Sequence, residues 1–209
     1  MALSLSDVKY SDIALLVRSI DYPAMQDGPL YRIMFNAILG DDEREDIVIW
    51  YTISMERAFY SGTQLCKACA VDGTPLGFAG WVLENATMCS RPDQSKRSCK
   101  EGNYLPDKLD VSAWLKVSNA LMEERKRILR TLNNVMRLTF MSVHTEHQNQ
   151  GVGSLMLKWI CQEADQHNRH MYVLASPAGV YLYAKFEFET VGQVDTGKGV
   201  ITSMLRKSR

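Results

Sequence analysis

The stretch from Leu138 to Gln166 reads LTFMSVHTEHQNQGVGSLMLKWICQEADQ and changes character twice along its length. Its first part, 138–144, is rich in apolar and β-branched side chains and contains neither glycine nor proline, which predicts a strand. A polar connection follows at 145–150. From Val152 onward the apolar residues recur at helical spacing, which predicts an amphipathic helix. The stretch therefore predicts a strand, a tight turn containing two glycines, and a helix.

The turn at 148–154 has the features of an anion-binding site. The first N–H groups of a helix have no partner inside the helix, and the helix dipole adds partial positive charge there. Gly151 and Gly153 would let a phosphate approach the main chain closely. However, neither GxxxxGK[ST] nor GxGxxG is present, and glycines that only ease a tight turn would give the same pattern. The residues alone leave both interpretations open.

Two motifs in this half of the chain resemble those of a known superfamily. Residues 148–153, QNQGVG, resemble the (Q/R)xxGx(G/A) signature of the GNAT superfamily of N-acetyltransferases. Residues 175–188, ASPAGVYLYAKFEF, resemble the later motif of the same superfamily, and the two motifs stand in the expected order. The specific resemblance covers the chain from about 135 to about 195. A looser resemblance over the whole chain is to a branch that is common in fungi.

The resemblance implies one α/β (α+β) domain over 1–209 with the GNAT fold. This fold is a twisted, mixed, largely antiparallel sheet of six or seven strands, flanked by helices, with a splayed central pair of strands. A polar segment at 84–110 is expected to be a mobile insertion. The implied activity is that of an acyl-CoA-dependent N-acyltransferase with acetyl-CoA as cosubstrate. We expect acetyl transfer to a primary amine of a small molecule; a protein N-terminal or lysine acetyltransferase and a non-catalytic acyl-CoA-binding domain are the alternatives.

The resemblance also assigns roles to residues near the two motifs. The turn would hold the phosphates of the cofactor, and main-chain groups of the preceding strand would hold its pantetheine arm. Tyr183 would be the acid that protonates the leaving thiolate, with Tyr181 as its rival and plain core packing as the alternative. The cofactor-binding residues expected on this basis are Met141, Ser142, Val143, Gln148, Asn149, Gln150, Gly151, Val152, Gly153, Ser154, Ser176 and Tyr183.

The sequence does not identify a general base. In some GNAT enzymes a glutamate on the central strand has this role, but the aligned residue here is Arg137. His144 and Glu146 follow the strand and are the catalytic residues that we consider for it. An imidazole titrates in the useful pH range, although an exposed turn histidine or a chain of water molecules to solvent would also fit.

Three residues depart from the family pattern. Gln150 stands where arginine is common, Ser176 where asparagine is common, and Glu187 where the later motif has glycine. The first change removes a cation that would face phosphate. None of the three removes the main-chain N–H groups that would bind pyrophosphate, so we expect them to affect catalytic rate more than cofactor binding.

Composition limits the classes of partner. The 209 residues are 46% hydrophobic and 23% charged, with a formal net charge of zero, which suits a globular domain with a substantial core. A neutral chain has no general attraction to nucleic acid or membrane, and we expect neither a signal peptide nor a transmembrane helix, since no long apolar run is present. Five cysteines, an odd number, favour reduced thiols and a cytoplasmic location. We expect no nucleic-acid or membrane partner, and a monomer or homodimer.

A metal site is not expected. Cys66 and Cys69 form a CxxC motif, but residues three apart on a strand point to opposite faces. They are thus badly placed to bind one tetrahedral metal ion, which needs four ligands.

Spacing and turn signals predict the remaining elements. Helices are expected at 11–20, 30–39, 41–60, 114–129 and, briefly, after 177–179; strands are expected at 3–10, 64–71, 76–83, 171–175, 189–194 and 200–205; a loop is expected at 21–29. Asp72-Gly73 predicts a hairpin. Tyr22, Tyr31, Phe35 and Trp50 occur where the resemblance puts the wall of the acceptor site, although aromatic residues at helical spacing usually pack in the core.

Overall fold

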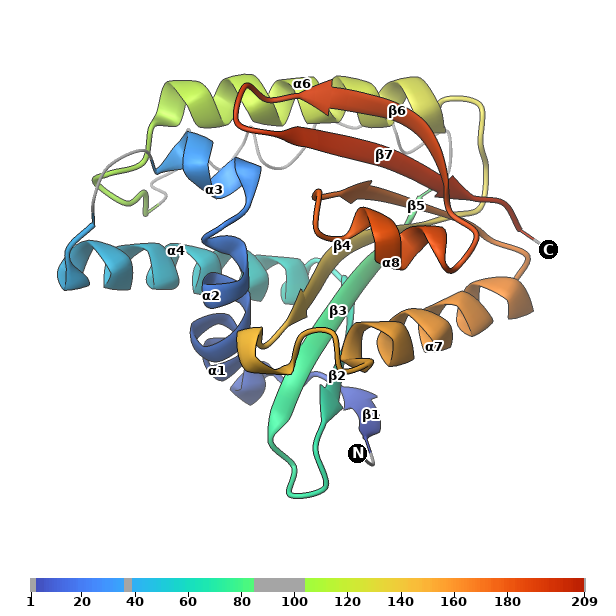
Figure 1. Cartoon of the computed structure of the whole chain (residues 1–209), viewed down its shortest axis with the longest axis horizontal. Helices are drawn as coiled ribbons and strands as arrows, with labels where there is room; N and C mark the ends of the chain where they lie inside the picture. Colours follow the sequence, from blue (N-terminus) through green and yellow to red (C-terminus); the bar gives the residue numbers. More distant parts are fainter. Residues whose placement is uncertain (1–2, 36–38, 85–103, 209) are drawn as a thin grey trace.

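The computed structural model describes residues 3–35, 39–84 and 104–208. Its centre is one sheet of seven strands in the order β1-β2-β3-β4-β5-β7-β6, with helices on both faces (Figure 1). Neighbouring strands are antiparallel, except that β4 and β5 are parallel. The expected fold class is therefore confirmed: an α/β fold with a mixed, largely antiparallel sheet.

The elements have the following bounds. The strands are β1 (Ser4–Asp7), β2 (Gln64–Cys69), β3 (Pro75–Glu84), β4 (Val135–Val143), β5 (His170–Ala175), β6 (Glu189–Asp195) and β7 (Val200–Arg206). The helices are α1 (Ile13–Leu16), α2 (Tyr22–Met25), α3 (Pro29–Met34), α4 (Asp41–Tyr60), α6 (Val111–Leu129), α7 (Val152–Gln166) and α8 (Val180–Ala184). A π-helical turn, η2 (Val17–Asp21), joins α1 to α2, and short 3-10 turns occur at η1 (Tyr10–Asp12) and η4 (Thr145–His147).

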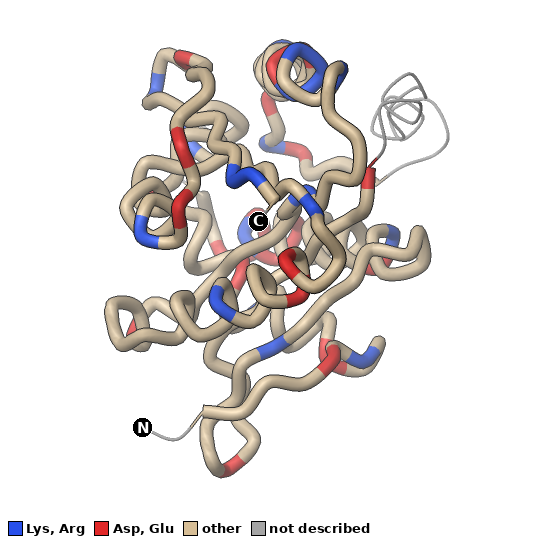
Figure 2. The backbone as a smooth tube through the Cα atoms, turned by 90° about the vertical axis from the view of Figure 1, so that its right-hand side faces the viewer, with Lys and Arg blue, Asp and Glu red and all other residues tan. Residues whose placement is uncertain are grey.

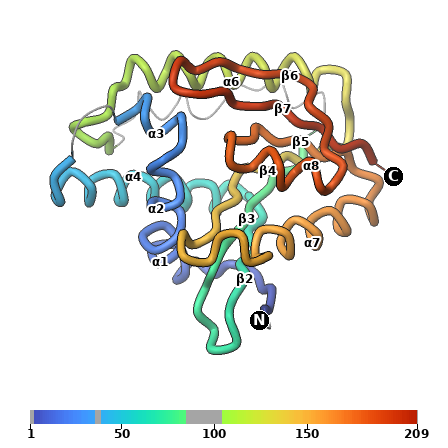
Figure 3. Tube along the Cα trace, viewed as in Figure 1, coloured from blue at the N-terminus to red at the C-terminus, as the bar shows by residue number. Residues whose placement is uncertain are grey.

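The predicted hairpin forms between β2 and β3 and projects from the body of the molecule (Figure 3). Gly73 has a φ of +86°, a left-handed conformation that glycine adopts without steric cost. The Asp72 carboxylate accepts a hydrogen bond of 2.9 Å from the main-chain N–H of Thr74. Such a local carboxylate contact is typical of a turn that starts with aspartate.

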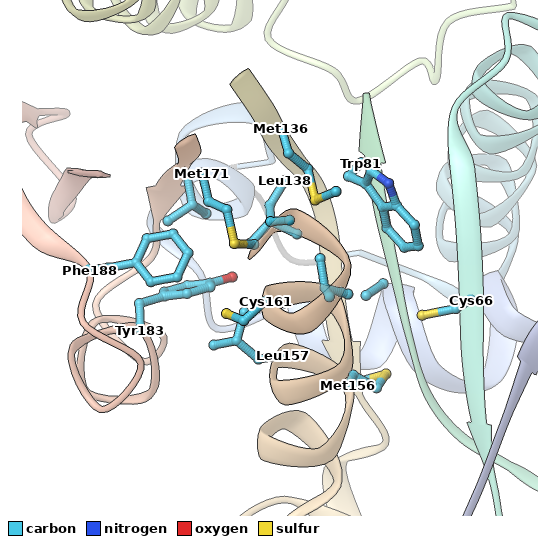
Figure 4. Packing of buried hydrophobic residues seen from close by; sticks show 14 of the residues in the cluster. Cys66, Trp81, Met136, Leu138, Met156, Leu157, Cys161, Met171, Tyr183 and Phe188 are labelled. Atoms are coloured by element: carbon cyan, nitrogen blue, oxygen red, sulfur yellow. The ribbon is translucent and has the colours of Figure 1, made fainter. Parts of the chain in front are cut away.

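Two apolar clusters lie on opposite faces of the sheet. On one face α7 buries Met156, Leu157 and Ile160 against the strands (Figure 4). On the other face α1, η2 and α4 bury a second set that includes Ile20 and Ile47. The spacing of apolar residues that predicts these helices is therefore the spacing of their buried faces. Each fully buried side chain of this size contributes roughly 1.5–3 kcal/mol to stability.

The central strands splay apart. β4 and β5 pair only where Val135–Arg137 lies beside His170–Tyr172. Beyond that point β4 continues to pair with β3 as far as Val143, and β5 continues with β7 as far as Ala175. A gap therefore opens between β4 and β5 toward their carboxyl ends, as expected. A register shift in β3 between Gly80 and Trp81 accompanies it, and bulges of this kind bend a strand.

Some expected boundaries are wrong. Most of the expected loop at 21–29 is helical, because η2 runs directly into α2. Pro23 is compatible with this because it lies in the first turn of α2, where an N–H would have no partner inside that helix. β4 begins three residues before the expected start at Leu138.

Two other expectations fall partly on residues that the structure does not describe. The helix expected at 30–39 is α3, and residues 36–38 lie outside the described ranges. Of the expected mobile insertion at 84–110, residues 85–103 lie outside them. The segment at 104–110 packs beside α3, where the N–H of Asp110 donates to the carbonyl of Met34 at 2.8 Å.

The surface charge is mixed. Figure 2 shows acidic and basic residues interspersed along the described chain, which agrees with the formal net charge of zero. None of the helices in the described ranges is long and apolar enough to span a membrane.

Candidate active site

The turn between β4 and α7 has a left-handed backbone at two positions. Asn149 has a φ of +59° and Gly151, which caps α7, has a φ of +89°. Asparagine tolerates this conformation better than most residues, and glycine has no steric cost there. A Cβ on Gly151 would meet no atom of the described residues within 4 Å. Gly151 is therefore needed for its conformation, and its Cα faces open space in which a ligand could approach.

The first turn of α7 offers main-chain donors. It begins with Val152, Gly153 and Ser154, whose N–H groups precede the first helical hydrogen bond, from Leu155 N–H to the Gly151 carbonyl at 2.9 Å. The sequence of this turn, VGSL, contains no acidic residue to neutralise the positive end of the helix dipole. Free N–H groups at a positive helix terminus form an anion-binding site. The structure thus provides the geometry that a phosphate requires.

Two glutamines stabilise the turn. The Gln148 side-chain amide donates to the carbonyl of Val143 at 3.3 Å. The Gln150 amide donates to the carbonyl of Glu146 at 2.8 Å. In this structure both side chains therefore bind main-chain oxygens of the segment itself. Gln150, at the position where arginine is common in the resembling family, supplies shape to the turn instead of a cation.

Gly153 brings three elements together. A Cβ at this position would lie 3.2 Å from Cδ2 of Leu182 and 3.6 Å from Cγ2 of Val143. The missing side chain therefore lets the start of α7 pack closely against α8 and against the end of β4. The two sequence motifs that resemble the GNAT family meet here, at the open end of the gap between β4 and β5.

One edge of β4 faces that gap. The N–H of His144 donates to the carbonyl of Leu76 in the β3 segment at 2.8 Å, so the main chain at this position faces β3. Main-chain groups alternate in direction along an antiparallel strand. The N–H and C=O groups of Met141 and Val143 therefore face away from β3 and toward the gap. These are two of the residues expected to hold an extended ligand by main-chain contacts.

Tyr183 lies inside the molecule and Tyr181 outside. Tyr183 is 4% exposed and packs against Phe188, with ring centroids 5.4 Å apart and its hydroxyl directed into the cluster that contains Cys161 (Figure 4). Burial raises the pKa of Tyr183 well above its usual value, so the hydroxyl stays protonated. Tyr181 is 73% exposed, with the Lys185 ammonium 4.3 Å from its ring centroid. Of the two tyrosines, only Tyr183 is positioned toward the core.

The residues considered for the base lie on the η4 turn. The Nδ1 atom of His144 accepts a hydrogen bond of 3.3 Å from the N–H of Glu146, and the centroid of its ring lies 5.4 Å from that of the tilted His147 ring. His144 is half-buried and Glu146 is exposed. Arg137, at the aligned base position, forms an ion pair with Glu84. That position therefore carries a paired cation, which agrees with the expectation that it has no base role.

Ser176 lies where β5 leads into α8. It is exposed, and its carbonyl accepts a hydrogen bond of 2.9 Å from the N–H of Gly179. The residue thus shapes the turn that precedes α8. Among the described residues, no group of three or more histidine, cysteine, aspartate or glutamate side chains could hold a metal ion.

The structure reveals one polar residue that the sequence interpretation missed. Asp21, at the end of η2, is 3% exposed, and its Oδ1 accepts a hydrogen bond of 2.6 Å from the Ser142 hydroxyl. Burial raises the pKa of Asp21 to about 6, and the Ser142 hydrogen bond opposes that shift. A signal for its burial was available, since Asp21 follows Val17 by four residues and so extends the same buried helical face.

The four aromatic residues expected at an acceptor wall form a continuous chain. Ring centroids lie 6.2 Å apart for Tyr22 and Tyr31, 5.0 Å for Tyr31 and Phe35, and 6.2 Å for Phe35 and Trp50. Tyr22 and Phe35 are buried, and the other two are half-buried. They belong to the cluster on the face opposite α7, the same face on which Asp21 lies.

Part of the chain is similar to a known family of domains. Residues 121–208 match the model of a family described as acetyltransferase (GNAT) domain. No curated protein matches the chain. The matched segment contains β4, the turn, α7, β5 and α8, which are the elements that build the site described above.

Solved structures of acetyltransferases share the fold over nearly the whole chain. A structure described as histone acetyltransferase HPA2 and related acetyltransferase from Corynebacterium glutamicum has a TM-score of 0.66 at 14% identity, covering 100% of this chain and 98% of that one. yncA from Salmonella typhimurium, solved with its cofactor acetyl-CoA, has a TM-score of 0.54 at 15% identity, with coverages of 100% and 95%. The PaiA N-acetyltransferase from Thermoplasma acidophilum, in complex with coenzyme A, has a TM-score of 0.55 at 12% identity, with 99% of both chains covered.

At these identities the structural likeness establishes the fold, and the resemblance to a fungal branch stays a prediction. The family match and the shared fold point to the same group of proteins, and two of these neighbours were solved with acetyl-CoA or coenzyme A. Residues 121–208 are therefore similar to the acetyltransferase (GNAT) domain, and the described residues have the fold of the solved GNAT acetyltransferases.

Proposed function

We propose that the chain transfers the acetyl group of acetyl-CoA to a primary amine of a small molecule. The observation that carries this proposal is a juxtaposition at one end of the sheet. The first turn of α7, with its free N–H groups, lies at the open end of the gap between β4 and β5. A phosphate-binding turn beside a gap toward which main-chain groups of β4 are directed suits a long ligand with a phosphate at one end.

The residues fit acetyl-CoA in chemical terms. The N–H groups of Gly151, Val152, Gly153 and Ser154 would bind the pyrophosphate, and the open space at Gly151 leaves room for it. The main-chain groups of Met141 and the N–H of Val143 would bind the amide groups of the pantetheine arm. When bound, acetyl-CoA supplies an activated thioester carbonyl. The enzyme would then hold amine and carbonyl together, which can supply several powers of ten in rate.

Tyr183 would act at the sulfur. A phenol kept protonated by burial is a permanent hydrogen-bond donor, although its raised pKa makes it a weak proton source. A donor placed where negative charge develops stabilises the transition state more than the ground state. We therefore assign Tyr183 the role of donating a hydrogen bond to the leaving thiolate. His144 and Glu146, on the η4 turn, remain the residues considered for proton removal by the sequence argument.

The acceptor side favours a small molecule over a protein. A protein acetyltransferase would need an open, acidic groove for a peptide. Here the chain of rings from Tyr22 to Trp50 packs together on the acceptor side. Within the described ranges Cys66, Cys69 and Cys161 are buried free thiols, which agrees with the proposed cytoplasmic location. A monomer or homodimer without a nucleic-acid or membrane partner stays our prediction.

Calorimetric titration with acetyl-CoA and with CoA tests the proposal. Gly151→Glu should abolish binding, because it adds negative charge at the phosphate site and strains a backbone with a φ of +89°. Gly62→Glu is the matched control: Gly62 has a φ of +87°, faces space free of described atoms, and lies in the turn after α4. Binding by wild type and Gly62→Glu, lost in Gly151→Glu, would support the proposal. Absence of binding by the wild type would overturn it.

A further inference from the structure

A buried carboxylate lies against the splayed part of β4, on the face of the sheet opposite α7. Asp21 is 3% exposed, and its Oδ1 is held at 2.6 Å by the hydroxyl of Ser142. Ser142 lies on β4 between Met141 and Val143, the two residues whose main-chain groups face the gap. The hydrogen bond therefore fixes the Asp21 carboxylate to the part of β4 along which the acetyl-CoA arm would run.

Asp21 has no cationic partner in the part of the chain that the structure describes. The elements packed against η2 are α1, α2, α4 and β4. β4 contributes the Ser142 hydroxyl, α4 contributes Tyr51, and α2 contributes Tyr22 next to it, while the buried residues of α1 are apolar. Burial of a carboxylate with neither an ion pair nor a full set of hydrogen bonds is costly. A ligand that brings a positive charge would remove that cost.

The surroundings of Asp21 suit a positively charged ligand. Tyr22, Tyr31 and Tyr51 lie close enough to one another to interact electrostatically, and Tyr51 interacts in the same way with Asp21. Aromatic faces attract ammonium groups, more strongly where water is excluded. Burial raises the pKa of Tyr31 and Tyr51 above the usual value, so these hydroxyls add no negative charge of their own. One carboxylate among tyrosines therefore forms an environment that suits a cationic group.

We propose that Asp21 binds the ammonium group of the acceptor and takes up its proton, and that the acceptor is a primary alkylammonium whose carbon chain lies against Tyr22, Tyr31 and Tyr51. The inference rests on the proposed acetyl transfer and identifies its acceptor side. Asp21 contacts β4 from the α4 face of the sheet, whereas Tyr183 belongs to the cluster on the α7 face. The nucleophile and the donor to the leaving sulfur thus approach from opposite faces.

The reaction balances with these groups. The ammonium gives one proton to Asp21, and the nitrogen lone pair forms a bond to the thioester carbonyl carbon. The carbon–sulfur bond breaks and its electron pair leaves on sulfur. The second proton, lost by nitrogen as the amide forms, neutralises the thiolate, and Asp21 releases the first proton to solvent. A carboxylate with a pKa of about 6 is ionised at neutral pH and is more basic than an ordinary aspartate, which suits this role.

Steady-state kinetics on three variants test the inference, with 2-phenylethylamine and 1,4-diaminobutane as acceptors and with acetyl-CoA affinity measured by calorimetry. Asp21→Asn keeps the shape of the side chain and the contact with Ser142. We expect it to leave the Kd for acetyl-CoA within about two-fold and to lower kcat/KM for the amine about 100-fold or more. Ser142→Ala, which frees the carboxylate, should lower kcat/KM about ten-fold. Asp27→Asn is the control, because the Asp27 side chain is 99% exposed, and it should change neither quantity.

The pH profile separates catalysis from structure. In the wild type, kcat/KM for the amine should fall as pH decreases through about 6, because Asp21 becomes protonated. This acidic limb should be absent from the residual activity of Asp21→Asn. If the wild type acetylates either amine and Asp21→Asn does so at the same rate, the inference is overturned. Binding of acetyl-CoA without turnover of either amine would overturn the acceptor class, whereas absence of acetyl-CoA binding would overturn the proposed function itself.

Discussion

The two faces of the sheet use different chemistry at the same gap. On the α7 face the groups available to a ligand are main-chain N–H groups of residues 151–154, close together in sequence. On the α4 face they are side chains, led by Asp21 and Tyr51, which come from different elements. The hydrogen bond between Asp21 and Ser142 joins residues 121 positions apart. A site made of main chain leaves a short glycine motif in the sequence, whereas a site made of distant side chains leaves none.

The largest expected effect separates Tyr183 from its exposed neighbour. Tyr183→Phe removes a buried donor without changing the shape of the side chain, so kcat should fall about 100-fold while the Kd for acetyl-CoA stays unchanged. Tyr181→Phe should leave kcat within about two-fold, because Tyr181 is 73% exposed. Thiol release measured at saturating substrates decides between the two. An unchanged kcat in Tyr183→Phe would reduce this residue to core packing.

The next effect concerns the folding stability that is lost by burying the Asp21 carboxylate on the α4 face. The pKa of Asp21 is about 6 in the folded protein, above the aspartate value of 3.8. The folded state therefore binds the extra proton between these values, and this group destabilises the fold as pH rises through that window. The difference of about two pKa units corresponds to at most about 3 kcal/mol above pH 6.

Asp21→Asn should therefore raise the free energy of unfolding at pH 7.5 and leave it nearly unchanged at pH 4, while it lowers activity. Urea unfolding at both pH values measures this gain. A lower free energy of unfolding for Asp21→Asn at pH 7.5 would show that the ionised carboxylate stabilises the fold. That result would contradict the account of Asp21 as a functional residue that destabilises the folded protein.

On the α7 face, the close packing of Gly153 against Leu182 and Val143 can be tested by substitution. A methyl group at Gly153 would lie 3.2 Å from Leu182 and 3.6 Å from Val143, so Gly153→Ala should destabilise by about 1 kcal/mol and weaken acetyl-CoA binding. Gly197→Ala is a control in the β6–β7 hairpin, where no described atom lies within 4 Å. It should affect stability through backbone strain alone and leave acetyl-CoA binding unchanged. Equal losses of affinity in both variants would exclude a local role for Gly153.

The smallest expected effect is a gain in stability. Glu187 has a φ of +66° and stands where the resembling motif has glycine, which adopts this conformation without strain. Glu187→Gly should therefore stabilise the protein by roughly 0.5–1 kcal/mol. Glu189→Gly, in β6, should destabilise it, because glycine weakens a strand. Thermal unfolding of both variants compares them, and destabilisation by Glu187→Gly would mean that contacts of the Glu187 side chain outweigh its backbone strain.

The same comparison explains what the sequence could predict. The turn, α7 and the β2–β3 hairpin follow from local signals, namely hydrophobic spacing and glycines at left-handed positions such as Gly73 and Gly151. The splayed pair was expected only from the resemblance, because strand pairing depends on contacts between distant segments. The loop expected at 21–29 was wrong because the prolines and the glycine of this segment do not prevent helix formation: Pro23 lies in the first turn of α2, where proline is compatible with a helix. The site around Asp21 was therefore missed with it.

The most direct test of the central claim is a map of amide chemical shifts in the isotopically labelled protein, titrated first with CoA and then with 2-phenylethylamine. CoA should shift the amides of Gly151, Val152, Gly153 and Ser154 most, followed by those of Met141 and Val143. The amine should then shift residues on the α4 face around Asp21. The account predicts that the cofactor and the amine bind at one gap through chemically different faces of the sheet. It would be contradicted if the largest shifts caused by CoA lay outside 141–154, or if the shifts caused by the amine were confined to the α7 face.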